Sequence, residues 1–369
     1  MQKTAIVCVS NDLSTDQRVH KTCLTLQKCG YWVVEVGRLL PDSKPLERPY
    51  FVLRKKLRFR SGPLFYAELN IRFFLYLLFA EVDLIFANDL DTLPAAFLAA
   101  KLRNKRLIYD THEYYTETPE LIHRPVTQTI WKAIENFIFP HLTDIITVNE
   151  SIAKLYSDKF NKKVHVCRNI PLSVASKSHI KKEALGISSD KNVILYQGAL
   201  NVGRGLEWIL ETMPLIENAI LLIIGEGDIR HKLQQLTKKL KIEDKVVFLG
   251  RIDSNKLAEY TPLADIGLCL LEEKGLSYYY SLPNRVFDYM NAGVPILATD
   301  FPEITKIVET YKTGILIDHY EPDYLAKVIT EMLTVPLNTD HFKNISKELC
   351  WEKEEKILME VIRGNYIEQ

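Results

Sequence analysis

Hydrophobic positions along the chain gather in short runs rich in β-branched residues, and longer stretches of helical character separate these runs. Such alternation predicts βαβ units on a parallel sheet. A first series of predicted strands covers residues 4–10, 32–38, 82–88, 106–111, 144–149 and 164–169. A second series covers residues 193–198, 219–225, 246–250, 266–271, 295–299 and 314–318. We therefore expect an α/β protein with two doubly wound sheets.

A polar segment rich in Lys and Ser, 171–190, separates the two series and is predicted to be a linker running into a short helix. We expect an N-terminal domain over 1–172 and a C-terminal domain over 173–350. The last segment, 351–369, has helical periodicity and is predicted to pack back against the first domain. Ligands of such sheets bind beyond the carboxyl ends of the strands, so we expect a site in the crevice between the domains.

Composition narrows the class of protein. Lys plus Arg equals Asp plus Glu at 47 each, so the net charge gives no sign of a nucleic-acid partner. The six cysteines have no CxxC spacing and are predicted to be reduced and structural. The N-terminus enters a strand without a signal-peptide pattern, and the run at 73–80 is shorter than the roughly 20 residues that cross a bilayer. These features predict a cytoplasmic protein.

The most informative segment is 277–299, SYYYSLPNRVFDYMNAGVPILAT. A loop is predicted to end at Asn284, where a helix begins; Gly293 closes that helix, and Pro295 opens a buried strand. The first N–H groups of a helix are unpaired and partly positive, so they suit a phosphate. Asp288, one turn inside, can accept hydrogen bonds from ribose hydroxyls. An ordinary turn before an ordinary helix explains the pattern equally well.

This segment resembles the nucleotide-sugar-binding signature of the family 4 glycosyltransferases, which have the GT-B fold of two facing Rossmann-like domains. In that family two carboxylates usually stand eight positions apart, the second within a pattern like E-A-M-A-x-G-x-P. Asp288 keeps the second carboxylate and is expected to hold the ribose, whereas Tyr280 replaces the first. The resemblance is to a branch with the motif S-x-P-N-[KR]-x-F-[DE]-Y. It implies that the diphosphate is held by the loop Ser281, Leu282, Pro283 and Asn284.

A second match lies at 196–207, where the family reads G-R-x-x-x-x-K-G from Gly198 onward. Arg204 stands at the lysine position and Ala199 at the arginine position, so we expect Arg285 to supply the second cation. Fixed cations stabilise the negative charge that builds on a departing diphosphate. The alternative for Arg204 is a solvated residue at the start of a helix.

Three shorter matches follow in the family's order. Gly225 begins a G-E-G-D turn that permits close backbone approach. Arg251 follows an F-x-G segment whose backbone is expected to meet the base. Glu303 lies in a segment resembling G-x-x-E and is expected near the donor. Each match is weak alone, and their common order across the second half of the chain gives them weight.

The first half supplies the expected acceptor side. His112 follows a predicted strand at the place where family members often carry a histidine near the donor sugar, with Glu113 as the alternative residue. A structural role for this histidine is nearly as plausible. Asp89 ends another strand and is expected to face the crevice. Asp16 and Arg18 replace the glycine-rich first loop of many relatives and are expected to line the acceptor side.

The stretch 48–79 concentrates basic residues among aromatic ones before the run FFLYLLF. Cations beside exposed aromatic rings suit an anionic membrane surface, at about 1 kcal/mol per cation. We expect peripheral contact with the inner face of the plasma membrane, with a lipid-linked acceptor close by. The alternative is a solvated basic loop followed by a buried helix.

The resemblance implies a retaining, metal-independent glycosyltransferase that moves a hexose from a nucleoside diphosphate sugar to a glycan or polyprenyl-linked acceptor, in cell-surface polysaccharide or glycoconjugate synthesis. His112, Glu113 and Arg204 are the expected catalytic residues, and no cofactor beyond the donor is expected. The DxD triplet that begins at Asp89 precedes a helix in the first domain, so we do not expect it to bind a metal. Alternatives are a sugar-nucleotide epimerase on the same scaffold and a non-catalytic nucleotide-sugar-binding protein. A dehydrogenase is disfavoured because G-x-G-x-x-G follows neither 4–10 nor 193–198.

Overall fold

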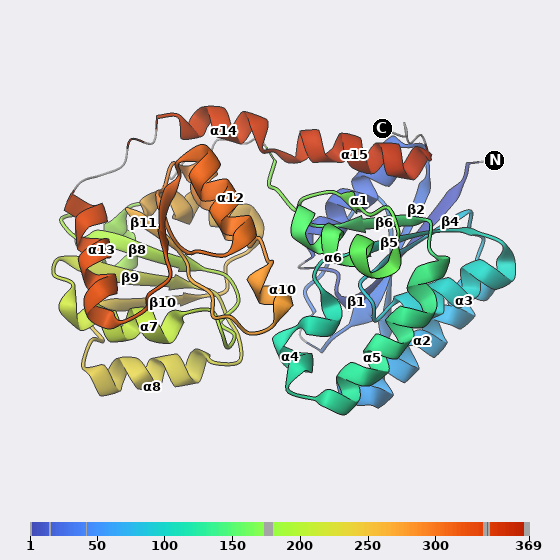
Figure 1. Cartoon of the computed structure of the whole chain (residues 1–369), viewed down its shortest axis with the longest axis horizontal. Helices are drawn as coiled ribbons and strands as arrows, with labels where there is room; N and C mark the ends of the chain where they lie inside the picture. Colours follow the sequence, from blue (N-terminus) through green and yellow to red (C-terminus); the bar gives the residue numbers. More distant parts are fainter. Residues whose placement is uncertain are drawn as a thin grey trace. The chain divides into compact units, whose positions relative to one another are not determined.

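The structure is a computed structural model that describes residues 2–14, 16–41, 43–172, 180–334, 338 and 340–364. Contacts divide the chain into two compact units. The first comprises Met1–Asn169 with Lys353–Gln369, and the second comprises Ile170–Glu352. Each unit is built around one parallel sheet with helices on both faces (Figure 1). Two parallel α/β sheets of this kind confirm the predicted fold class.

The first unit has a seven-stranded parallel sheet in the order β3-β2-β1-β4-β5-β6-β7. Its strands are β1 (Thr4–Asp12), β2 (Trp32–Leu39), β3 (Phe51–Lys56), β4 (Leu84–Asn88), β5 (Arg106–Thr111), β6 (Asp144–Thr147) and β7 (His165–Val166). Its helices are α1 (Gln17–Lys28), α2 (Gly62–Phe79), α3 (Leu93–Arg103), α4 (Pro119–Ile122), α5 (Pro125–Ile138), α6 (Glu150–Phe160) and α15 (Trp351–Arg363). In Figure 1, α2, α3 and α5 cover one face of the sheet, and α1 and α15 the other.

Strand β3 was not predicted, because its sequence FVLRKK lies in the segment that was interpreted as a basic loop or membrane-contacting surface. It pairs with β2 along its length, from Val34 opposite Phe51 to Leu39 opposite Lys56. As an edge strand it is only partly buried, so its pattern lacks the continuous apolar run of a central parallel strand. Its cations also protect the open edge from pairing with another chain.

Helix α2 begins at Gly62 and buries Phe65, Leu69, Phe73 and Leu77, one residue per turn. The run FFLYLLF is therefore divided between the core and the surface, because Phe79 is 81% exposed. None of the helices in the described ranges is long and apolar enough to cross a membrane.

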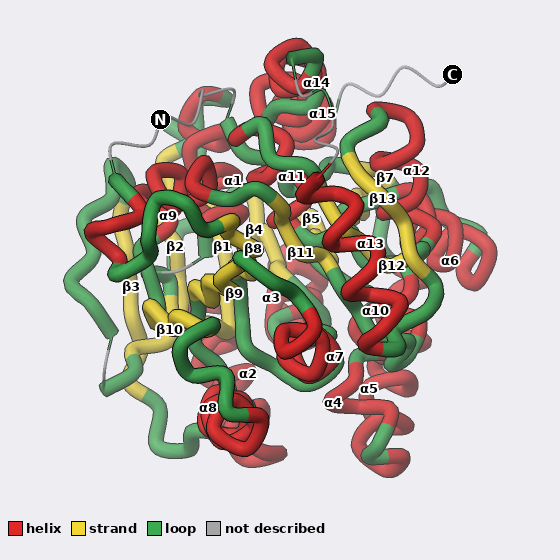
Figure 2. The backbone as a smooth tube through the Cα atoms, turned by 90° about the vertical axis from the view of Figure 1, so that its left-hand side faces the viewer, coloured by secondary structure: helices red, strands yellow, loops and turns green. Residues whose placement is uncertain are grey.

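The second unit has a six-stranded parallel sheet in the order β10-β9-β8-β11-β12-β13 (Figure 2). The strands are β8 (Asn192–Gln197), β9 (Ala219–Ile224), β10 (Val246–Gly250), β11 (Ile266–Cys269), β12 (Ile296–Thr299) and β13 (Gly314–Ile317). The helices are α7 (Leu206–Thr212), α8 (Arg230–Leu240), α9 (Ser254–Tyr260), α10 (Leu276–Tyr279), α11 (Asn284–Ala292), α12 (Pro302–Tyr311), α13 (Pro322–Thr334) and α14 (Phe342–Glu348). Every strand predicted for this half is present.

Both faces of the second sheet are buried. Along β8, Ile194 and Tyr196 enter one apolar cluster, while Val193 and Leu195 enter the other. Successive side chains of a strand point to opposite faces, so one strand connects both cores. Full burial of each such aliphatic side chain contributes roughly 1.5–3 kcal/mol, and this packing fixes the carboxyl end of β8, where the site begins.

Two segments that were predicted from sequence lie partly outside the residues that the structure describes. In the expected linker, 173–179 lies outside the described residues, and a short 3-10 helix covers Lys182–Leu185. In the last segment, 365–369 is likewise not described, while the described α15 contacts the first unit. Arg106 Nη2 donates to the carbonyl oxygen of Val361 at 2.6 Å.

Candidate functional site

The second sheet changes direction between β8 and β11. The chain proceeds from β8 to β9 and β10 on one side, and from β11 to β12 and β13 on the other, although β8 and β11 are neighbours. At such a switch point the loops that leave the two strands diverge at their carboxyl ends. The loop 198–205 follows β8, and the segment leading to α11 follows β11. The strongest predicted donor residues lie on these two segments.

Arg285, at the start of α11, is the most unusual side chain at this point. It is only 7% exposed, and its Cζ lies 4.5 Å from the centre of the Tyr196 ring, at the end of β8. A Cβ atom added at Gly198 would lie 3.7 Å from Arg285 Cζ. Arg285 Nη1 is buried without a hydrogen-bond partner among the residues that the structure describes. Tyr196 contacts this guanidinium, but no carboxylate pairs with it in the described structure. A buried cation without a counter-charge is costly, so this position favours an anionic ligand.

Arg204, on the loop after β8, likewise stacks on a tyrosine ring. Its Cζ lies 4.4 Å from the centre of the Tyr278 ring, and its Nε is buried without a partner in the described part of the chain. Such stacking of a guanidinium on an aromatic ring fixes the direction of its N–H groups. The charges of both cations act at the end of β11: burial raises the pKa of the Cys269 thiol, while Arg285 and Arg204 oppose that rise.

Asp288 lies one helical turn after Arg285, so the two side chains share a face of α11. Gln197 Nε2, at the end of β8, donates to Asp288 Oδ2 at 2.9 Å. Thr261 Oγ1 in turn donates to Gln197 Oε1 at 2.9 Å. This chain of hydrogen bonds fixes the carboxylate beside the end of β8. A carboxylate accepts about four hydrogen bonds, so Asp288 suits hydroxyl groups such as those of a ribose.

The loop before α11 leaves the start of that helix without a side-chain cap. Pro283 stands at the cap position with extended backbone, and the first turn of α11 contains no acidic residue. Ser281 Oγ donates to the carbonyl oxygen of Tyr278 at 2.8 Å, so this hydroxyl turns back onto its own loop. Leu282 packs against the apolar core, and Asn284 is exposed. The amide of Val286 donates to the carbonyl oxygen of Pro283 at 3.0 Å, so the amides of Asn284 and Arg285 remain as the anion-binding groups of this loop.

Four other predicted donor residues have more distant or different surroundings. A Cβ atom at Gly225 would collide with the carbonyl oxygen of Gly198, so glycine is required here by the contact between two loops of the chain itself. Arg251 is exposed after β10, two strands away from β8. Glu303 is buried in the first turn of α12, which follows β12. The half-buried Tyr280 packs edge-on against Tyr279, with 4.9 Å between ring centres.

In the first unit, His112 lies between two carboxylates at the end of β5. Its Nδ1 is 3.2 Å from Asp89 Oδ2, and its Nε2 is 3.3 Å from Asp110 Oδ2. Burial opposes a charge on the ring, but Asp89 and Asp110 outweigh burial and raise the pKa of His112 well above 6.5. His112 is therefore an imidazolium whose two N–H groups donate to carboxylates. In this state it supplies positive charge and cannot accept a proton.

Arg18 does not line an acceptor surface, which corrects the expectation from sequence. It is 4% exposed, and its Nε and Nη2 donate to the two oxygens of Asp110 at 2.9 and 2.7 Å. Its Nη1 donates to the carbonyl oxygen of Cys167 at 2.8 Å. Burial alone would raise the pKa of Asp110, but Arg18 and His112 hold that pKa well below its usual range. Arg18 therefore positions Asp110, which in turn holds His112.

The remaining candidates on this side have local roles. Asp16 caps α1, because its Oδ1 accepts from the amide of Val19 at 3.0 Å. Asp89 has a φ of 59°, and its Oδ1 accepts from the amide of His112 at 2.8 Å. Glu113 is half-buried, and its carbonyl oxygen accepts from Thr111 Oγ1 at 2.7 Å.

Asp91, the second acid of the DxD triplet, is 7% exposed, and burial followed by repulsion from Asp89 raises its pKa to about 7. Such an acid is half-protonated near neutrality, which does not favour metal binding. Within the described ranges, no group of three or more His, Cys, Asp or Glu residues is arranged to hold a metal ion. All six cysteines are free, as expected, and five of them are buried.

Sequence reasoning missed the residues that hold the site residues in place. Asp110 supports His112, Gln197 supports Asp288, and Tyr196 and Tyr278 support the two arginines. A signal was present in each case except Tyr278: Asp110, Tyr196 and Gln197 all lie at the carboxyl end of a predicted buried strand, where ligand sites form.

Comparison with known proteins finds a family model that resembles the second unit. Residues 177–349 match the model of the family "Glycosyl transferases group 1". An uncharacterised glycosyltransferase of Methanocaldococcus jannaschii is 28% identical over 223 residues, which are 57% of this chain and 55% of that protein. The alpha-monoglucosyldiacylglycerol synthase of Streptococcus pneumoniae is 22% identical over 251 residues, 62% of this chain and 55% of that protein. The chain thus spans about half the length of these relatives.

A solved structure extends the comparison to both units. The Anabaena protein HepE in complex with UDP-glucose has a TM-score of 0.77 to this chain at 16% sequence identity. The match covers 98% of this chain and 99% of the Anabaena chain. At this level of identity the likeness establishes the fold, which is of the GT-B type.

Proposed function

We propose that this chain, whose residues 177–349 match the model of the group 1 glycosyl transferases, transfers a sugar from a nucleoside diphosphate sugar to an acceptor hydroxyl. One observation carries the proposal: two guanidinium groups without carboxylate partners in the described structure, those of Arg204 and Arg285, lie on the two segments that leave the switch point, and Arg285 is one helical turn before Asp288. Unsatisfied buried charge favours a dianionic ligand. The relation to HepE, whose solved complex contains UDP-glucose, supports a nucleotide sugar as that ligand.

In the proposed complex, Arg204, Arg285 and the first amides of α11 bind the diphosphate, and Asp288 binds the ribose. Gly198 and Gly225 have no side chain, so the backbone at these positions can approach the ligand closely. Arg251 and Glu303 belong to the outer part of the donor site. The bond from the anomeric carbon to the diphosphate oxygen breaks, and its electron pair stays on the diphosphate. The arginines stabilise the negative charge that develops on the diphosphate. This stabilisation accelerates the reaction most when the charge is present in the transition state and absent from the ground state.

We further propose that transfer of a hexose retains configuration and needs no metal. The acceptor oxygen bonds to the anomeric carbon on the face that the diphosphate leaves, and its proton passes to a leaving phosphate oxygen. His112, as an imidazolium, contributes charge and orientation and is not the base. Asp16, Asp89 and Glu113 belong to the acceptor side. This assignment follows from the raised pKa of His112, which its two carboxylate neighbours cause.

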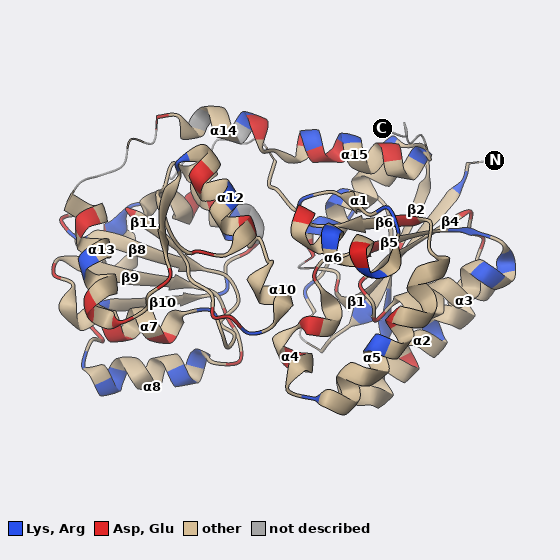
Figure 3. Cartoon of the chain, in the orientation of Figure 1, with Lys and Arg blue, Asp and Glu red and all other residues tan. Residues whose placement is uncertain are grey.

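The acceptor is proposed to be a glycan or a polyprenyl-linked sugar, handled in the cytoplasm at the inner face of the plasma membrane during cell-surface glycoconjugate synthesis. The streptococcal relative, named as a glucolipid synthase, supports a lipid-containing acceptor. Helix α2 exposes Leu64, Ile71, Leu75 and Phe79, and the neighbouring α5 exposes Val126, Ile130 and Phe137. Tyr66 of α2 packs edge-on against Trp131 of α5, with 5.1 Å between ring centres. In Figure 3 the visible surfaces of both helices are mostly uncharged, as peripheral membrane contact requires.

The experiment has two stages. A panel of nucleotide sugars is first screened for thermal stabilisation of the wild-type protein and of Arg285→Met, with Lys239→Met, on the exposed surface of α8, as the control for loss of a cation. The stabilising donor is then incubated with glycan and lipid-linked acceptors, and products are identified by mass spectrometry. We expect transfer that falls about 10²- to 10³-fold in Arg285→Met and is unchanged in Lys239→Met. Isomerisation of the donor without an acceptor would instead establish an epimerase, and binding without turnover a non-catalytic protein.

A further inference from the structure

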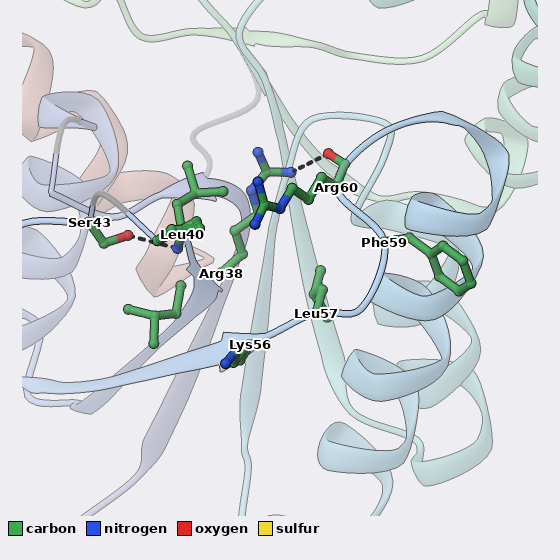
Figure 4. Close-up of a pocket in the computed structure, with 9 residues that line it drawn as sticks. Arg38, Leu40, Ser43, Lys56, Leu57, Phe59 and Arg60 are labelled. Atoms are coloured by element: carbon green, nitrogen blue, oxygen red, sulfur yellow. Dashed lines mark hydrogen bonds between the residues drawn. The ribbon is translucent and has the colours of Figure 1, made fainter.

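A second cavity lies in the first unit, where β2 and β3 end. It has a volume of about 510 Å³ and is lined by Arg38 and the loop after β2 on one side, and by residues 56–60 on the other. Figure 4 shows Lys56, Leu57 and Arg60 of the segment from β3 to α2 across from Leu40 and Ser43 of the loop after β2, and the Phe59 ring farther along this segment, turned toward α2. No residue of this cavity belongs to the sites described above.

Among the lining residues that the structure describes, three are cations and none is a carboxylate. Arg38, Lys56 and Arg60 form no ion pair within the ranges that the structure describes. Two acids contact the lining from behind. Ser43 Oγ donates to Asp12 Oδ2 at 2.5 Å, and the amide of Phe59 donates to Glu68 Oε2 at 3.1 Å. Asp12 and Glu68 are in turn paired with Arg54 and Arg72, which do not line the cavity. Among the described lining residues, all the charged side chains are therefore cations.

The cation at the base of this cavity is held in place before any ligand binds. Arg38 Cζ lies 4.7 Å from the centre of the Phe65 ring, and Arg38 Nη1 donates to the carbonyl oxygen of Arg60 at 3.3 Å. Arg38 Nε is buried and has no hydrogen-bond partner in the described structure. A fixed guanidinium with an unused donor is a typical recognition group for phosphate.

The rest of the lining is apolar. Leu40 and Leu57 form part of the walls, and Phe59 is 42% exposed although it is a large aromatic residue. Leu64, in the first turn of α2, is also exposed a few residues farther along the chain. A cavity for a small inorganic anion alone would not need this apolar surface, so the lining fits an anion that carries a hydrocarbon group.

We propose that this cavity binds the phosphate or diphosphate of an acceptor that is attached to a lipid, with the hydrocarbon lying along Leu57 and Phe59. The inference rests on the proposed glycosyltransferase function and specifies its acceptor class. The donor has its own cations, Arg204 and Arg285, in the other unit, so the two anion sites have separate residues.

The position of the cavity in the sheet agrees with this role. In a parallel sheet all carboxyl ends lie at one edge, so the cavity and His112 share that edge. The order β2-β1-β4-β5 places His112 three strands from Arg38. With about 4.8 Å between neighbouring strands, the separation is roughly 14 Å. One elongated acceptor can therefore reach both places.

The test measures binding of farnesyl diphosphate in detergent, inorganic pyrophosphate in buffer, and anionic phosphatidylglycerol vesicles to the full chain. The variants are Arg60→Met and Lys56→Met, with Arg58→Met as the control for an exposed cation outside the cavity lining. Arg38→Met is a further variant, and its folding is checked by circular dichroism. Thermal stabilisation by the nucleotide sugar is followed in parallel.

We expect farnesyl diphosphate to bind at least tenfold more tightly than pyrophosphate, and each cavity variant to weaken it about tenfold. Arg58→Met should change it less than threefold, and stabilisation by the donor should be unchanged in all variants. Equal affinity for farnesyl diphosphate and pyrophosphate would overturn the lipid part of the proposal. Equal losses in Arg58→Met and Arg60→Met, or binding to vesicles only, would overturn the cavity itself. If no nucleotide sugar stabilised the wild-type protein against heat, the proposed function would be contradicted. The binding of farnesyl diphosphate would still test the cavity independently.

Discussion

Gln197 and Asp288 are 91 residues apart in sequence, and a 2.9 Å hydrogen bond joins the Nε2 atom of the first to the Oδ2 atom of the second. The bond links the end of β8 to the first turns of α11, which are the two segments at the switch point of the second sheet. It also determines which face the carboxylate presents, because Gln197 is itself held by Thr261. The ribose contact that we propose for Asp288 therefore depends on a residue that does not touch the ribose.

Replacing Gln197 by Glu should weaken donor binding. The change puts a second carboxylate at hydrogen-bond distance from Asp288, so one of the two must take up a proton or move away. We expect KM for the donor to rise about tenfold, with a smaller change in kcat, because ribose binding is common to the ground state and the transition state. Gln235→Glu, on exposed surface of α8, adds the same charge away from the site and should leave KM unchanged. Equal KM values for the two variants would show that Gln197 does not position Asp288 for donor binding.

Replacing Arg285 by Met should separate stability from function. Removing a buried cation that lacks a carboxylate partner relieves a desolvation cost, so the ligand-free protein should be as stable as wild type or more stable by about 1–2 kcal/mol. Stabilisation by the donor should be lost. Calorimetric unfolding with and without the nucleotide sugar measures both effects. A large destabilisation of the ligand-free variant would mean that Arg285 holds the fold together, and the anion-site interpretation would then fail.

The sequence predicts the central strands of both sheets well and the edge strand of the first sheet less well. Central strands such as β4 and β9 are continuous apolar runs because helices bury both faces, and that pattern is local. Strand β3 lies at the sheet edge, where partial burial permits FVLRKK, so no such run exists to find. Helix α11 was predicted to begin at Asn284 and does, because Pro283 before it and Gly293 after it are local signals.

The candidate site follows the same division. Positions at strand ends and helix starts were found from sequence, including Arg204, Arg285, Asp288 and His112. The burial, pairing and protonation of these side chains were not predicted, because they depend on partners that are distant in sequence. Arg18 was expected on a surface, yet it is buried against Asp110, 92 residues away. No local pattern distinguishes a solvated arginine from one that pairs inside the fold.

Protonation of His112 should make the stability of the first unit depend on pH. Its folded pKa is raised above 6.5, so its contribution is complete below pH 6.5 and is lost as pH rises through the folded value. Asp110 has a lowered pKa, and its contribution is present above about pH 4 and lost as pH falls. In urea unfolding from pH 5 to pH 9, His112→Asn should flatten the decline on the alkaline side. An unchanged decline in the variant would show that His112 is not the titrating group.

The buried pair of Arg18 and Asp110 should behave as a unit. Arg18→Met leaves a carboxylate in the interior without its main partner, so we expect a loss of about 3–5 kcal/mol in the free energy of unfolding. Asp110→Asn in the same chain removes the stranded charge and should recover a large part of that loss, which a double-mutant cycle measures. Because Asp110 also holds His112 Nε2, the double variant should regain stability without regaining transfer activity. Recovery of activity together with stability would show that Asp110 serves the fold alone and does not position the imidazolium.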